Sequence, residues 1–258
     1  MLQDFRSYQH ASLDFEKRLI ALTGENGAGK TNVLEALSLF TPGRGLRRIE
    51  LGDMVRHGAE AGFSLSLSLE STDGDSRKLG TGYEPAGSET PGRRCRIDGV
   101  SVASAGAFAD HVRLVWLTPA FDGLFAGPAG DRRRFLDRLV LAVNPDHASH
   151  VSALERALRS RNKLLEQDRP DENWLDAVER EIAETGVAVA AARRETIGRL
   201  AGLILESRDD TSPFPWAQLA LDGPIEAELA TAPALDVEDI YRDWLREGRW
   251  RDKAAGRT

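Results

Sequence analysis

Gly24-Glu25-Asn26-Gly27-Ala28-Gly29-Lys30-Thr31 forms the centre of the predicted fold. It matches G-x-x-x-x-G-K-[ST], the Walker A phosphate loop. Its glycines reach backbone conformations closed to other residues, so the loop can curl and turn its N–H groups toward phosphates. In such a loop Lys30 reaches the β- and γ-phosphate oxygens and the Thr31 hydroxyl binds Mg²⁺. The sequence therefore predicts a site for ATP and Mg²⁺. The predicted nucleotide-binding residues are Gly24, Glu25, Asn26, Gly27, Ala28, Gly29, Lys30, Thr31 and Asn32.

The segments on either side of the loop fit this motif. Residues 19–22 form an apolar run of strand length, and two earlier strands are predicted within residues 1–23. After the loop, Val33, Leu34, Leu37 and Phe40 recur at helical spacing, and Thr41-Pro42-Gly43 ends the pattern. A strand, a glycine loop and a helix is the order that the motif requires, because the helix N-terminus adds partial positive charge to the phosphate site.

The composition is ordinary for a globular protein. The chain has 258 residues, 41% of them hydrophobic and 29% charged, and its formal net charge is −7. A negative net charge does not indicate nucleic-acid binding, but a local basic patch can act on an acidic protein. No apolar run approaches membrane-spanning length, and the N-terminus lacks the apolar segment of a signal peptide. The single cysteine, Cys95, excludes an internal disulfide and fits a reducing cytoplasm.

The remaining chain predicts two lobes of different class. Residues 62–69 alternate between apolar and small polar residues, which indicates a half-buried strand, and Asp73-Gly74 predicts a turn. A weaker strand near 78–83 and a hairpin over 93–102 with Asp98-Gly99 at its turn complete an antiparallel block, and a further strand is predicted at 112–117. From 145 to about 207 the periodicity is helical, with a turn at 168–171, and a last helix begins near Asp236.

These patterns predict an α/β P-loop lobe with an antiparallel β block over residues 1–118 and a helical second lobe over 119–250. Helical patterns joined by a short connection predict an antiparallel pair. Trp216 to Leu221 predicts a short strand, and Asp131 predicts the N-cap of a helix.

Two basic stretches are candidates for contacts with DNA phosphates. One lies in the glycine-rich segment 43–48, and the other begins a helix after Gly130. The candidate residues are Arg44, Arg47, Arg48, Arg132, Arg133 and Arg134. The alternatives are a solvated loop for the first stretch and intramolecular ion pairs for the second.

Several segments together resemble the RecF family. Asp4-Phe5-Arg6-Ser7-Tyr8 resembles the opening strand of that family, and residues 24–35 resemble its phosphate loop and helix, Asn32 and Glu35 included. Residues 43–48, 119–122 and 127–137, with Arg-Arg-Arg-Phe-Leu-Asp, and 156–165 are similar to later family segments. The resemblance covers nearly the whole chain, and the last two segments are more specific than the Walker loop.

The resemblance implies an ABC-type ATPase head related to chromosome-condensing ATPases. Such a protein binds ATP and DNA, forms a homodimer around two nucleotides, and works with RecR and RecO at single-strand gaps to help load recombinase. It also implies a weak DNA-dependent ATPase activity and a part in DNA replication, repair and the SOS response.

The chain departs from the family pattern after Gly256-Arg257-Thr258, where residues 251–258 are predicted to begin a return to the first lobe. Neither the family's signature motif nor its Walker B acid follows, and the chain is interpreted as the N-terminal two-thirds of a RecF-like protein. The nearest Walker B pattern, Leu203-Ile204-Leu205-Glu206, is predicted to end a helix. The catalytic acid is therefore unknown, and ATP binding with weak or no hydrolysis is expected. A P-loop phosphotransferase and a non-catalytic nucleotide-binding interaction module are the alternatives.

Overall fold

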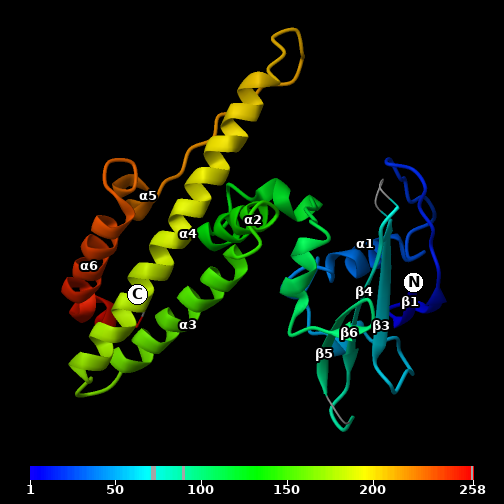
Figure 1. Ribbon diagram of the computed structural model, residues 1–258, viewed down its shortest axis with the longest axis horizontal. Coiled ribbons are helices and arrows are strands. Elements are labelled where there is room, and N and C mark those ends of the chain that lie inside the picture. The colour runs from blue at the N-terminus through cyan, green and yellow to red at the C-terminus, as the bar shows by residue number, and fades with distance from the viewer. Residues whose placement is uncertain (71–73, 89–90, 257) are drawn as a thin grey trace. The chain divides into compact units, whose positions relative to one another are not determined.

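The computed structural model describes residues 1–70, 74–88, 91–256 and 258. The chain folds into two compact units, Met1–Thr118 and Pro119–Thr258. Each unit is described by itself (Figure 1). The first contains an antiparallel sheet with short helices and the second is helical, which confirms the predicted α/β class. Asp73, in the predicted Asp73-Gly74 turn, lies outside the described residues.

Within the described residues, a six-stranded antiparallel sheet with the order β2-β1-β3-β4-β5-β6 forms the frame of the first unit. Its strands are β1 (Leu2–Phe5), β2 (Tyr8–Ala11), β3 (Phe63–Glu70), β4 (Ser76–Glu84), β5 (Gly92–Ile97) and β6 (Val100–Ser101). The alternating residues of β3 pair with β4 from Phe63 opposite Tyr83 to Glu70 opposite Ser76. The predicted hairpin at Asp98-Gly99 is confirmed by the pairing of Ile97 with Val100.

One face of this sheet carries the core of the first unit. Helix α1 (Lys30–Ser38) and the residues that follow it pack there, together with the 3-10 helices η1 (Gly52–Met54) and η2 (Ala105–Asp110). Phe5, Leu79 and Phe108 are fully buried in this cluster. Because side chains alternate along a strand, the opposite face of the sheet carries the small and polar residues of β3, β4 and β5.

Helices pack side by side in the second unit. They are η3 (Pro119–Gly123), α2 (Ala129–Leu141), α3 (His147–Leu165), α4 (Glu172–Glu206), α5 (Pro224–Glu228) and α6 (Ala234–Ala255). The predicted helix pair is confirmed: α3 and α4 lie together, with α6 against them (Figure 1). The Asp171 side chain caps α4 by accepting hydrogen bonds from the backbone of Asn173 and Trp174. Leu175, Ile182 and Leu245 form part of the core between these helices.

Three predicted strands do not form. Residues 19–22 and 112–117 are irregular, as are residues 216–221. A strand needs a neighbour for its backbone hydrogen bonds, and none of the six described strands pairs with residues 19–22. Leu19 is consequently 94% exposed. Residues 13–15 also lie outside the second strand, which ends at Ala11.

The predicted cap at Asp131 is wrong as well. Helix α2 begins two residues earlier, at Ala129, with Pro128 in the cap position, and Asp131 instead forms an ion pair with Arg134. Residues 203–206 end α4, as predicted, so this apolar run followed by an acid has no strand context. Residues 251–255 form the end of α6, and the return of 251–258 to the first lobe stays a prediction. No helix in the described part of the chain has the length and apolarity needed to cross a bilayer.

Candidate nucleotide-binding site

The glycines of the Walker loop have the backbone conformations that the motif predicts. The φ angles are +144° at Gly24, +88° at Gly27 and +94° at Gly29, a region that side-chain-bearing residues rarely adopt. Residues 23–28 are exposed, so the loop is open to a ligand from solvent. The loop is closed by a hydrogen bond of 3.2 Å from the Ala28 N–H to the Glu25 carbonyl oxygen.

Lys30 lies across this loop. Its Nζ donates hydrogen bonds of 2.7 Å to the carbonyl oxygens of Gly24 and Glu25. The ammonium group therefore lies within the curl of the loop, where an anion would meet it. Thr31 follows on the first turn of α1 and is exposed.

The beginning of α1 suits an anion. Gly29 is its N-cap residue and provides no side-chain cap, and the first turn contains no acidic residue. Within the described residues, the N–H groups of Lys30 and Thr31 donate no backbone hydrogen bond. Uncapped N–H groups and the partial positive charge of a helix N-terminus both favour a bound phosphate. The residues present therefore fit the triphosphate of a nucleotide.

Contact with Tyr8 is a second reason for glycine at position 29, besides its positive φ angle. A Cβ atom at position 29 would lie 2.4 Å from the Tyr8 hydroxyl oxygen, on strand β2. Any side chain would therefore displace either the loop or the tyrosine. The sequence could not reveal this contact, because the two residues lie 21 positions apart (29 − 8).

A buried carboxylate connects α1 to the first hairpin and to the basic segment 43–48. Glu35 is 0% exposed, and its two oxygens accept hydrogen bonds of 2.8 and 3.0 Å from the Arg6 guanidinium. Arg47 Nη1 lies 3.4 Å from Glu35 Oε2 and 3.4 Å from the Asn32 side-chain oxygen. Asn32 also donates a hydrogen bond of 3.0 Å to the Ser7 hydroxyl. This network joins a predicted nucleotide-binding residue to a predicted DNA-binding residue.

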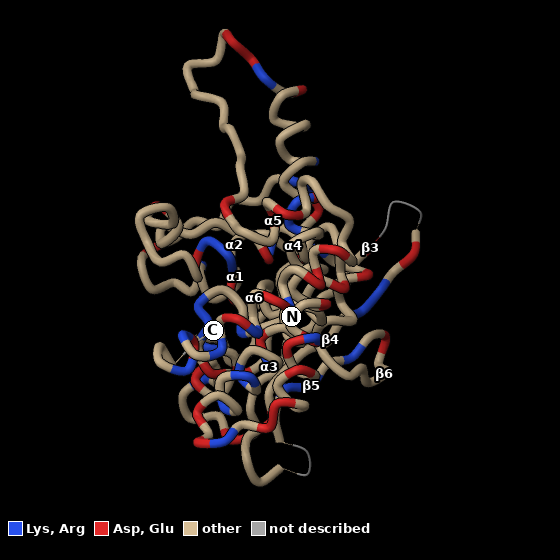
Figure 2. The backbone as a smooth tube through the Cα atoms, turned by 90° about the vertical axis from the view of Figure 1, so that its left-hand side faces the viewer, with Lys and Arg blue, Asp and Glu red and all other residues tan. Residues whose placement is uncertain are grey.

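The six candidate arginines differ in what they already contact. Arg44 forms an ion pair of 2.5 Å with Glu50, and Arg132 donates hydrogen bonds to the carbonyl oxygens of Phe125 and Gly127. Arg134 pairs with Asp131, and Arg48 also has an interaction within the chain. Arg133 is exposed and forms no ion pair within the described residues. Lys and Arg alternate with Asp and Glu along both units, so the basic stretches remain local (Figure 2).

The specific motifs of the second unit have structural contacts. Asp137, which ends Arg-Arg-Arg-Phe-Leu-Asp, accepts hydrogen bonds from His147 and Arg193, and it joins α2 to α3 and α4. Burial raises the pKa of Asp137. The hydrogen bonds from His147 and Arg193 and the charges of these residues lower it by more, so that the pKa lies below the ordinary 3.8. Arg161, from the segment 156–165, is fully buried against Glu179. Neither contact could be predicted from sequence spacing.

Comparison with known proteins agrees with this geometry. Residues 1–87, which include the Walker loop and α1, match a family model described as an AAA domain. The chain is 52% identical over 257 residues to the DNA replication and repair protein RecF of Rhizobium leguminosarum bv. trifolii (strain WSM2304), with 100% of this chain and 68% of the relative covered. The protein of the same name from Mesorhizobium japonicum is 49% identical, with 100% and 67% covered.

Solved structures share the fold. The structure of the recombination mediator protein RecF-ATPrS in the RecFOR pathway superposes with a TM-score of 0.87 at 20% identity, and covers 100% of this chain and 68% of that one. The corresponding RecF-ATP structure gives 0.82 at 19% identity. A P-loop at the start of α1 and an AAA-domain match define a P-loop nucleotide-binding protein of the ATPase class. The extensive identity goes further: the chain belongs to the RecF family.

Proposed function

We propose that this chain binds ATP and DNA in recombinational repair and replication, and that ATP increases its affinity for DNA next to a single-strand gap. The observation that carries the proposal is the Walker loop, in which Lys30 lies across three left-handed glycines at the uncapped end of α1. Family membership supports the same function and does not favour a P-loop phosphotransferase. A cytoplasmic location, RecR and RecO as partners, and a homodimer formed on ATP belong to the same proposal.

Each residue of the loop has a role in this proposal. Lys30 exchanges the carbonyl oxygens of Gly24 and Glu25 for β- and γ-phosphate oxygens, while the N–H groups at the start of α1 hold the phosphates. The Thr31 hydroxyl would hold Mg²⁺, which would neutralise phosphate charge when bound. Asn32 lies next to this site, and its side-chain oxygen accepts a hydrogen bond from Arg47. A displacement of the Asn32 side chain would therefore change the position of Arg47. We infer that nucleotide binding is communicated to the basic segment 43–48 by this route.

The test compares DNA binding with and without Mg-ATP. A fluorescently labelled gapped duplex is titrated with wild-type chain, with Lys30→Ala and with Lys17→Ala, a control at an exposed lysine. We expect Mg-ATP to tighten binding by wild type and Lys17→Ala by about tenfold, a coupling of ~1.4 kcal/mol. Lys30→Ala should show the affinity seen without nucleotide under both conditions. An equal response to ATP in Lys30→Ala and wild type would contradict the proposal.

Arg133 offers a separate test of the DNA contacts because it has no ion pair to lose in the described chain. If it contacts a phosphate, Arg133→Ala should reduce the dependence of log K on log salt concentration by about 0.9 for duplex DNA. Arg180→Ala, at an exposed arginine of α4 that also has no ion pair in the described chain, is the matched control. An unchanged slope in Arg133→Ala would remove this residue from the interface.

A further inference from the structure

The outer face of the sheet has an unusual set of side chains where β3, β4 and β5 meet. The register places Ser64, Gly82 and Arg94 in one row across the strands, and Ser66, Gly80 and Arg96 in the next. The buried Leu65, Thr81 and Cys95 point to the opposite face. The two glycines occupy the middle strand, so the centre of this face has no side chains.

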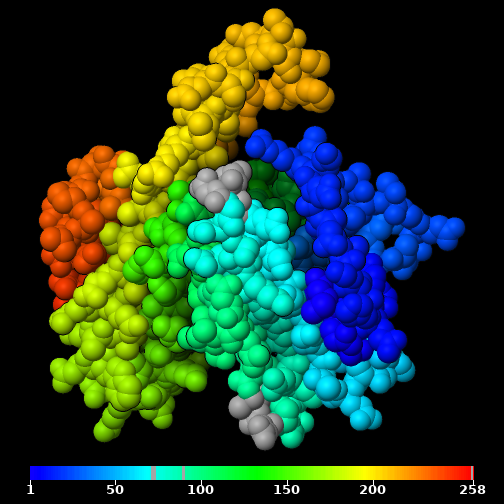
Figure 3. Space-filling view, turned by 45° about the vertical axis from the view of Figure 1, so that its right-hand side comes forward, coloured from blue at the N-terminus to red at the C-terminus, as the bar shows by residue number. Residues whose placement is uncertain are grey.

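The missing side chains leave a trough in the surface. A hollow of about 410 Å³ lies over this part of the sheet, and Gly80, Gly82, Ser64, Ser66, Arg94 and Arg96 contribute to its lining. The surface of these strands, cyan to green, is uncovered in Figure 3. A Cβ at Gly82 would lie 2.5 Å from the Phe63 carbonyl oxygen, so glycine is required there. At Gly80 the nearest atom would be 3.8 Å away, so that position tolerates a side chain.

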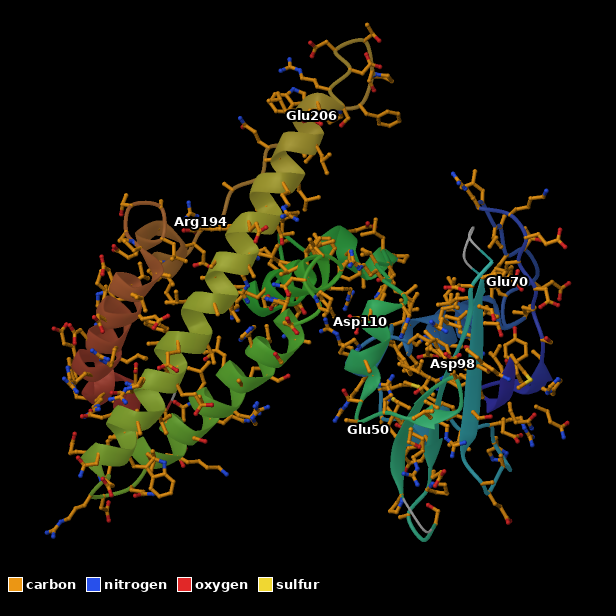
Figure 4. All side chains as sticks on the ribbon, in the orientation of Figure 1. Glu50, Glu70, Asp98, Asp110, Arg194 and Glu206 are labelled. Carbon is orange, nitrogen blue, oxygen red and sulfur yellow. The ribbon has the colours of Figure 1, made fainter. Side chains whose placement is uncertain are left out.

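Positive charge borders the trough. Lys78, Arg94 and Arg96 line it, against one lining carboxylate, Glu84, which lies 3.4 Å from Arg94. Lys78 and Arg96 form no ion pair in the part of the chain that the structure describes. Glu70 and Asp98, labelled in Figure 4, lie toward the Ser76 end of the strands, and Asp98 accepts a hydrogen bond from the Lys78 N–H at that end of the trough. The centre of the trough is therefore cationic although the chain as a whole is acidic.

We propose that this trough binds the sugar–phosphate backbone of a single nucleic-acid strand, a second DNA contact that adds to the proposed function and rests on it. Arg94 and Arg96 are two residues apart on one strand, hence roughly 6.6 Å apart along it. That separation suits successive phosphates of an extended strand. The serine hydroxyls can donate to phosphate oxygens, and the glycines allow the backbone close to the sheet.

The geometry favours a nucleic acid over an acidic peptide. An added peptide strand gains its main-chain hydrogen bonds at a sheet edge, whereas β4, at the centre of the trough, is paired with β3 on one side and with β5 on the other. A phosphodiester backbone needs only donors and positive charge, and this face supplies both. Two lining residues, Phe63 and Tyr83, are aromatic, but the strand alternation puts both on the core face with Leu65 and Thr81. The rows that face the trough contribute serine, glycine and arginine, so bases have no stacking platform there. Binding should consequently be independent of base sequence.

The first test measures binding of fluorescent oligothymidylate without nucleotide. Each single-strand phosphate contact contributes about 0.7 to the salt slope, so Arg94→Ala with Arg96→Ala should lower the slope by about 1.4 and weaken binding by roughly tenfold. Arg18→Ala with Arg113→Ala removes the same charge from exposed arginines outside the trough and is the matched control. Equal loss in the two double variants would overturn the proposal, since it would reflect net charge alone.

A second variant tests the shape of the site without changing its charge. Gly80→Leu should fill the trough and weaken oligothymidylate binding by several-fold, with unaltered circular dichroism and unaltered Mg-ATP binding. Full affinity in Gly80→Leu, or stronger competition by poly-glutamate than by poly-thymidylate of equal charge, would contradict the proposal. Failure of ATP to tighten gapped-duplex binding by wild type would contradict the proposed function instead, so the two failures are distinguishable.

Discussion

Glu35 shows how much of the candidate site depends on contacts distant in sequence. It lies on α1 only five residues after Lys30, yet its carboxylate binds Arg6 from the first hairpin and Arg47 from the segment after the helix. A buried carboxylate is stable only when paired and hydrogen-bonded, so these arginines fix the position of α1 against the sheet. The Walker motif could be predicted from its own residues. The support beneath it could not, because nothing in the spacing pairs Arg6 with Glu35.

Asp137 should make the second unit sensitive to acid. Its pKa is lower folded than unfolded, so its stabilisation is fully present above the ordinary pKa of 3.8 and is lost as pH falls through the lower folded value. Asp137→Asn should therefore lower the free energy of unfolding at neutral pH, and by less in strong acid. Urea unfolding at several pH values between about 2 and 7 measures this.

The control is Asp243→Asn, an exposed aspartate on α6 that has no ion pair in the described chain. It should change stability little at any pH. A difference between Asp137→Asn and wild type that stays constant down to the lowest pH would show that the charge of Asp137 is not what stabilises the helices.

Arg161 gives the strongest single-residue prediction for stability. It is 0% exposed, as is Glu179 beside it, and it also binds Asp252 and the Leu245 carbonyl oxygen. Arg161→Met removes the charge from a site that retains carboxylates, so we expect a loss of about 3 kcal/mol in the free energy of unfolding. Arg159→Met, on the exposed side of the same helix, should cost under about 1 kcal/mol. Similar urea midpoints for both variants would refute the role given to Arg161.

The long helices α3, α4 and α6 were predictable because apolar residues recur along one face of each, whereas the five-residue helix α5 was not predicted. α3 and α4 follow the predicted ranges, since 3.6-residue periodicity is a property of the local sequence. The apolar runs at 19–22 and 112–117 also carry a local signal, but a strand depends on a partner that the local sequence does not supply. Val112 and Leu114 nevertheless pack partly against the core, whereas Leu117 is exposed. For Val112 and Leu114 the apolar pattern thus indicated burial correctly, although it did not predict the backbone conformation.

Helix α4 allows a comparison between two apolar residues of one element. Ile182 is fully buried between α3, α4 and α6, while Leu203 near the end of the same helix is 60% exposed. Ile182→Ala should cost about 2–5 kcal/mol because it leaves a cavity in the core. Leu203→Ala should stay within about 0.5 kcal/mol. Urea denaturation followed by circular dichroism checks both, and equal midpoints would contradict the packing described for α4.

The two units contribute different parts of the proposed function. The first provides the phosphate loop, the basic segment 43–48 and the trough on the outer sheet face, and all three belong to one compact unit. The second provides a helical body whose motif residues, Asp137 and Arg161, are occupied in ion pairs. Family membership supplied the biological process, whereas the individual contacts come from the geometry.

Nucleotide binding by the phosphate loop can be measured by calorimetric titration of the purified 258-residue chain with Mg-ATP, in parallel with Lys30→Ala and Lys17→Ala. We expect saturable binding by wild type and Lys17→Ala, and a loss of at least about tenfold in affinity for Lys30→Ala, which lacks the charge that contacts the phosphates. Undiminished binding by Lys30→Ala, or no binding by the folded wild-type chain, would contradict the role given to this loop.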